Sequence, residues 1–229
     1  MNPDPLARYL QRLPTLITFF FSVMLVTFFR EFMVTFKLNT GPVFDLSTPA
    51  HILIGISFIA TLFFVVSVWL SYSLLIERFP YTLDYSVFFF DVIRFSVLYF
   101  IFSFSFLAGS PPNYVYFIAA MAVFHLLMAG WHTNRLRHFQ GTERMERVAD
   151  IRGHLLRAGT YFLLAVIYYV TVTLRWEASQ PWALHSALVV ITSVLLVYWN
   201  AKRLGEMKTK ALAAQAAAKQ QQQAAAPAK

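Results

Sequence analysis

The chain has 229 residues, of which 58% are hydrophobic and 13% are charged, and its formal net charge is +8. An ordinary soluble domain carries about 25% charged residues, so this composition indicates an integral membrane protein. The sequence contains no cysteine, which excludes disulfides, thiolate metal sites and cysteine nucleophiles.

The first fifteen residues lack the apolar core and cleavage site of a signal peptide, so we expect the first hydrophobic segment to be retained. Six continuously apolar segments follow, each close to the roughly 20 residues that a helix needs to cross a bilayer. They are expected at residues 13–36, 52–76, 87–107, 114–131, 158–174 and 182–198. Transmembrane strands alternate apolar and polar residues, which these segments do not do. The predicted fold class is therefore all-α and polytopic.

Lysine and arginine lie mainly in the N-terminus, the second and fourth connections and the C-terminal tail. Only Arg30, Lys37 and Arg175 lie on the other side. The orientation rule for basic residues then predicts that both termini are cytoplasmic, with residues 1–206 forming the transmembrane domain of an inner (plasma) membrane protein. Topology also accounts for the positive net charge, so we expect no nucleic-acid partner.

The third segment contains FFFDVIRF, which places Asp91 and Arg94 inside an apolar run. An ionised side chain near the bilayer centre costs at least about 2.5 kcal/mol, so such groups normally face the bundle interior and pair. Residues three apart are neighbours on a helix, and Asp84 lies seven residues earlier on the same face. We expect a polar face on the cytoplasmic half of this helix.

A short connection at residues 109–113 should make the third and fourth segments antiparallel neighbours. This pairing places Arg94 opposite Leu127 and Asp91 opposite Gly130. His125 and His132, which are seven residues apart, then flank the charged pair. The expected candidate site consists of Asp84, Asp91, Arg94, His125 and His132.

Three interpretations of this site remain open. A carboxylate beside a titratable histidine can form a proton or ion path. The same groups can instead be an ion pair that only fixes helix packing. Haem binding is a minor alternative, because His125 would need a second axial histidine at equal depth, and both His51 and His185 lie at the outer ends of their segments. No metal site and no other cofactor is expected.

The fourth connection is basic, and from Thr142 onward its apolar residues recur at helical spacing. It is expected to continue the fifth segment below the membrane, to lie on the inner leaflet, or to dock a cytoplasmic partner through five arginines. These are Arg135, Arg137, Arg144, Arg147 and Arg152. His132, His138 and His154 of segment 132–157 are expected to be solvated. The Ala/Gln-rich tail, residues 207–229, should be frayed helix or disordered.

The sequence contains no phosphate-binding loop, nucleophile elbow or metalloprotease motif, so an enzyme is not expected. The favoured hypothesis is a membrane protein that conducts an ion or a proton through the polar seam between the third and fourth segments. The alternative is a non-catalytic subunit that anchors or assembles a larger membrane complex. The expected partners are membrane lipids and either further copies of the chain or other membrane subunits.

Overall fold

The computed structural model describes residues 5–40, 48–78, 85–136 and 139–225, and within these ranges the regular structure is helical, with no strand. Six helices are long and apolar enough to cross a membrane. The prediction of an all-α, multi-pass membrane protein is therefore confirmed. In chain order the elements are α1 (Pro5–Thr40), α2 (Pro49–Arg78), α3 (Tyr85–Ser105), η1 (Phe106–Gly109), η2 (Pro111–Asn113), α4 (Val115–Arg135), α5 (Gly141–Tyr168), η4 (Tyr169–Thr173), α6 (Trp176–Ser179) and α7 (Trp182–Ala225).

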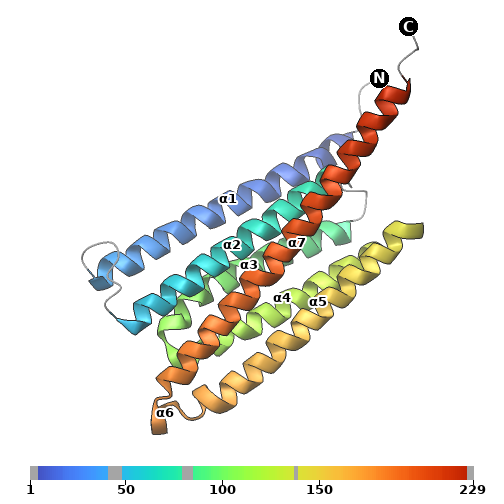
Figure 1. Cartoon of the computed structure of the whole chain (residues 1–229). Helices are drawn as coiled ribbons and strands as arrows, with labels where there is room; N and C mark the ends of the chain where they lie inside the picture. Colours follow the sequence, from blue (N-terminus) through green and yellow to red (C-terminus); the bar gives the residue numbers. More distant parts are fainter. Residues whose placement is uncertain (1–4, 41–47, 79–84, 137–138, 226–229) are drawn as a thin grey trace.

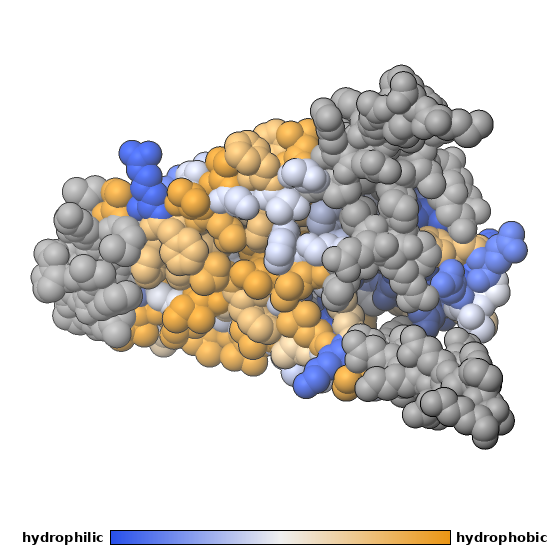
Figure 2. Space-filling view, turned by 90° about the horizontal axis from the view of Figure 1, so that it is seen from above, coloured by the Kyte–Doolittle hydropathy of each residue, from blue (hydrophilic) through white to orange (hydrophobic). Residues whose placement is uncertain are grey.

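The six long helices form one elongated bundle, in which α1 begins and α7 ends at the same end (Figure 1). Helix α4 packs between α3 and α5, whereas α2 packs against α3 and α7, and α1 lies on α3. On the face seen in Figure 2, apolar residues cover the middle of the bundle and hydrophilic residues lie toward its two ends. This distribution suits a bundle whose middle is surrounded by lipid.

Aromatic side chains hold α1 in place. Phe28 is fully buried and stacks on Phe102 of α3 with ring centroids 3.5 Å apart. One turn further along, Phe32 stacks on Phe58 of α2 at 3.9 Å. Lipid is as apolar as these rings, so close packing rather than removal from water favours this association.

The short connection between α3 and α4 is tied to the helices around it. A Cβ atom at Gly109 would lie 2.6 Å from the Ile54 side chain of α2, so glycine permits this close approach. The hydroxyl of Thr173 donates to the carbonyl of Pro112 at 3.1 Å, and the hydroxyl of Tyr168 contacts the carbonyl of Pro111. These contacts fix the end of the bundle that lies away from the chain termini.

Helix α5 begins at Gly141 and continues without a break into the fifth apolar segment. The amphipathic part of the fourth connection is therefore the first half of a long helix. This agrees with the expectation that the segment continues the fifth apolar segment below the membrane. Helix α7 likewise continues through the alanine-rich tail to Ala225. Both helices project toward the end of the bundle where α1 begins (Figure 1).

Candidate functional site

Asp91 and Arg94 form an ion pair inside the bundle. Both side chains are buried, and Arg94 Nη2 lies 3.2 Å from Asp91 Oδ1. The guanidinium also lies over three aromatic rings, with 4.8 Å to Tyr72, 4.9 Å to Phe95 and 5.6 Å to Trp131. Such contacts stabilise a cation where water is absent.

The depth of this pair agrees with the antiparallel register expected from the sequence. Arg94 Nη1 donates to the sulfur of Met128 at 3.9 Å, one residue from the expected neighbour Leu127. The nearest side chain to Gly130 is that of Phe90, adjacent to Asp91. Helices α3 and α4 thus meet where the Asp91 and Arg94 side chains lie.

Three histidines form a second cluster, between α4 and α5. The Nδ1 atoms of His125 and His154 are 3.1 Å apart, and the ring of His132 stacks on His154 with centroids 5.4 Å apart. Relative exposure is only 1% for His132 and 2% for His154. The expectation that these two residues are solvated is therefore wrong. Since α5 packs along α4, the face that carries His154 turns inward.

The histidine cluster has the contacts of a hydrogen-bonded group rather than of a metal centre. No group of three or more potential ligands in the described ranges has a geometry that could hold a metal ion. His154 supplies the second histidine at the depth of His125 that a haem would require. However, the two rings are in direct contact, which leaves no space for a haem between them.

Tyrosines continue this cluster toward the other end of the bundle. Tyr161 stacks on His125 with centroids 5.6 Å apart, and Tyr114 lies 5.8 Å from Tyr168 by the same measure. The Tyr168 hydroxyl is 2.6 Å from His185 Nδ1. The other ring nitrogen of His185 is 2.9 Å from the carbonyl oxygen of Ala108, in the connection after α3.

Tyr161 and Tyr114 are the facing ends of the two halves of this arrangement. No ring contact or hydrogen bond joins these two phenols, and both hydroxyls are buried without a hydrogen-bond partner in the described residues. The hydroxyls of Ser57 and Ser193 lie around that of Tyr114 but miss strict hydrogen-bond geometry. Buried polar groups of this kind are normally satisfied by ordered water.

We call the seven aromatic residues of this arrangement the polar column. From the end of the bundle where α1 begins to the opposite end, they are His132, His154, His125, Tyr161, Tyr114, Tyr168 and His185. Of these seven residues, the sequence predicts only His125 and His132 as members of a candidate site. The available signal was the seven-residue spacing of His154, Tyr161 and Tyr168, which puts all three on one face of α5.

The remaining predicted residues are distributed differently. Asp84 and Arg137, like His138, lie outside the described residues. Arg135 is buried, with its guanidinium 4.8 Å from the centroid of the Trp131 ring, so it faces the bundle and not a docking surface. Arg147 pairs with Asp150 at 3.2 Å. Of the five arginines of the basic segment, Arg144 and Arg152 are exposed.

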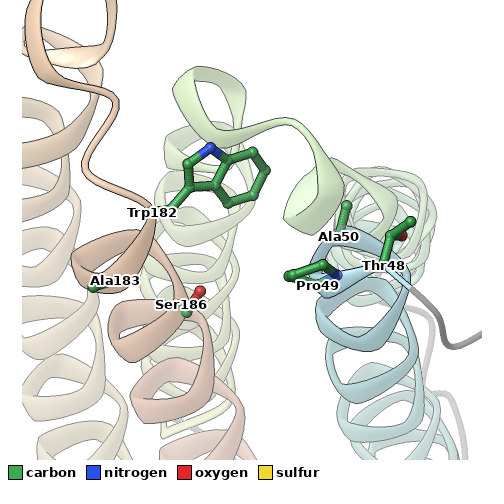
Figure 3. A pocket seen from close by; sticks show the side chains of 6 residues that line it. All are labelled: Thr48, Pro49, Ala50, Trp182, Ala183 and Ser186. Atoms are coloured by element: carbon green, nitrogen blue, oxygen red, sulfur yellow. The ribbon is translucent and has the colours of Figure 1, made fainter.

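An apolar pocket of about 470 Å³ lies at the other end of the bundle, between the start of α2 and the start of α7 (Figure 3). Its lining residues are Thr48, Pro49, Ala50, Trp182, Ala183 and Ser186. The ring of Trp182 lies 5.7 Å from that of His185. The pocket therefore adjoins the last residue of the polar column.

No protein-family model, no curated protein and no solved structure matches this chain. Its function is therefore inferred from the geometry of the buried polar groups within a multi-pass helical membrane bundle.

Proposed function

We propose that this protein conducts protons across the membrane along the polar column. The observation that carries the proposal is the direct contact of His125 and His154, 3.1 Å apart in the bundle interior, within a series of imidazoles and phenols. Ionisable and polar groups are costly inside a membrane, and where they occur they often mark ion or proton paths. A purely structural bundle needs no such series.

The chemistry of the column suits proton transfer. A neutral imidazole donates through one nitrogen and accepts through the other, so it can take part in a hydrogen-bonded chain. In the His125–His154 contact one Nδ1 carries the hydrogen and the other accepts it, so the two rings adopt opposite tautomers. A phenol can likewise accept one hydrogen bond while it donates another, as Tyr168 can between His185 Nδ1 and the carbonyl of Pro111.

Water completes the proposed path at two places. The nitrogens of His132 have no hydrogen-bond partner among the described residues, and neither do the hydroxyls of Tyr161 and Tyr114. A water molecule bound at each place would link neighbouring members of the column. Protons, rather than larger ions, are the proposed cargo, because relay between fixed groups needs no open pore.

The proposed orientation places His132 toward the cytoplasm and His185 toward the outside of an inner membrane, following the distribution of basic residues. Asp91 and Arg94 belong to α3, which packs against α4. Through the adjacent residues Trp131 and His132, the ion pair adjoins the cytoplasmic entrance of the column, and the rings of these two residues are 4.9 Å apart. In this proposal the ion pair positions α3 against α4 and shapes the entrance.

The test is proton flux into liposomes that contain the purified protein and a pH-sensitive dye. Under an imposed potassium diffusion potential, the wild-type protein should acidify or alkalinise the vesicle interior according to the sign of the potential. Tyr161→Phe removes one hydroxyl from the column but keeps the ring, so the flux should fall at least tenfold. Tyr169→Phe is the matched control, because this phenol is 48% exposed on the outer face of the bundle.

A second candidate function is that of a subunit that assembles a larger membrane complex. The observation in its favour is the outer face of α5, where Leu156, Phe162 and Leu163 are 59–70% exposed at the edge of the bundle (Figure 1). Lipid covers such a face equally well, and further copies of the chain or other subunits are the proposed protein partners. Stoichiometric co-purification of another membrane protein, lost on Phe162→Ala and Leu163→Ala, would favour this second function.

A further inference from the structure

A small, partly open cavity lies beside the polar column, where α2, α3, α4 and α7 meet. Its volume is about 10 Å³, which is the space of one water molecule or one monatomic ion. Its polar lining comes from Ser71, Tyr72, Arg94, Trp131 and Arg203. These side chains supply guanidinium, indole and hydroxyl groups, and the described lining residues include no carboxylate.

Hydrogen-bond donors at this cavity lack acceptors. Arg94 is buried, and its Nε and Nη2 atoms have no hydrogen-bond partner in the described part of the chain. Asp91 lies at ion-pair distance from Nη2 but does not meet hydrogen-bond geometry. The indole Nε1 of Trp131 is likewise buried and without an acceptor. Such unsatisfied buried donors indicate that the described residues provide no acceptor at this place.

The charge around the cavity is also unbalanced. Arg203 is half-buried, and no described residue makes an ion pair or a hydrogen bond with it. The charged groups that act on it most strongly are the carboxylate of Asp150 and three further guanidiniums, those of Arg157, Arg94 and Arg147. Asp150 already pairs with Arg147, and Asp91 already pairs with Arg94. Among the described residues, Arg203 therefore has no counter-ion of its own in a poorly solvated place, which is energetically unfavourable.

We propose that this cavity binds one monatomic anion of the halide class, held between the guanidiniums of Arg94 and Arg203. A halide accepts hydrogen bonds from all sides, which suits a lining made of donors. Its negative charge would balance the positive charge of Arg203, for which no described carboxylate is left. The small volume favours a monatomic anion over a polyatomic anion such as phosphate. The site is independent of the proposed proton path, because the cavity is lined by none of the seven residues of the polar column.

Halide binding is tested with purified protein in detergent, where no gradient and no flux are involved. The melting temperature should be several degrees higher in sodium chloride or bromide than in sodium gluconate of equal ionic strength, because gluconate is too large to enter. Equilibrium dialysis with radioactive chloride should give one bound ion per chain. Arg203→Gln should weaken that binding at least tenfold and remove the difference in melting temperature.

The matched control is Lys202→Gln, which removes one positive charge from the exposed neighbour of Arg203 and should leave chloride binding unchanged. Arg203→Lys, which keeps the charge, should retain weaker binding and serves if Arg203→Gln does not fold. Equal melting temperatures in chloride and gluconate for the wild-type protein, with no bound radioactive chloride, would show that the cavity holds water only. Equal loss of binding in Lys202→Gln would show a general charge effect and overturn the proposed site.

Discussion

Asp91 and Arg94 show how burial decides the energetic weight of an ion pair. The pair Asp150–Arg147 has the same three-residue spacing and the same 3.2 Å separation, but the side chain of Asp150 is 41% exposed. Exposed pairs contribute about 0–1 kcal/mol, whereas removing one partner from a buried pair costs about 3–5 kcal/mol. The chain thus contains its own comparison of a buried pair with a partly exposed one.

We predict that Asp91→Asn lowers the free energy of unfolding by about 3–5 kcal/mol, because it leaves the Arg94 cation buried without a carboxylate. Asp150→Asn, in the partly exposed pair, should cost less, about 1 kcal/mol. Replacing both buried partners, as in Asp91→Leu with Arg94→Met, should recover most of the stability. Denaturant titration in micelles measures all three. Equal effects of the two Asp→Asn changes would contradict the buried position of Asp91.

The sequence predicts the contact between Asp91 and Arg94 well, but it does not predict the burial of His154. The spacing of Asp91 and Arg94 in an apolar helix is sufficient to expect their contact. His154 follows a run of charged residues, and its surroundings in the sequence resemble a solvated loop. Its burial depends on the packing of α5 against α4, a long-range contact that local spacing does not specify.

Helix α1 shows how a helix of this bundle is held by one face. Phe28 is fully buried against Phe102, whereas the adjacent Phe29 is 48% exposed. The sequence does not indicate which of these two residues is buried, because both are phenylalanines in one apolar run. Only the rotation of the helix against α2 and α3 distinguishes the packed side from the exposed side.

We predict that Phe28→Ala weakens the association of α1 with the bundle by at least the roughly 0.5–1.5 kcal/mol of an aromatic pair. Phe29→Ala, its neighbour, should change stability by less than about 0.5 kcal/mol. Protease resistance of α1 and the melting temperature in detergent measure this difference. The opposite ranking would mean that α1 presents another face to α2 and α3.

At the scale of elements, the positions of the six apolar helices follow closely from hydropathy, because each must be long and apolar to cross a bilayer. The continuation of α5 from Gly141 was also among the expected arrangements. Neighbour relations were predicted only where the connection is short, as between α3 and α4. The contact of α4 with α5 and of α2 with α7 required the structure.

For the whole molecule, an even number of spans places the start of α1 and the end of α7 at the same end of the bundle (Figure 1). Which end faces the cytoplasm is a proposal from the distribution of basic residues. Because the chain contains no cysteine, single cysteines report this orientation without background labelling.

We predict that Thr142→Cys, in the first turn of α5, is not labelled by a membrane-impermeant maleimide in intact cells. It should be labelled once the cells are permeabilised and the reagent reaches the cytoplasm. A cysteine at Ser179 in α6 should react in intact cells. Both positions are exposed in the structure, so access to the reagent rather than burial decides the result. Labelling of Thr142→Cys in intact cells would reverse the proposed orientation.

Proton conduction along the polar column would appear directly as a current through the reconstituted wild-type protein in a planar bilayer. We expect a reversal potential that shifts by about 59 mV for each unit of pH difference, the value for a one-charge carrier, and that does not respond to sodium or potassium gradients. Correctly folded protein that gives no current above the bare bilayer, or a reversal potential set by sodium or potassium, would contradict it.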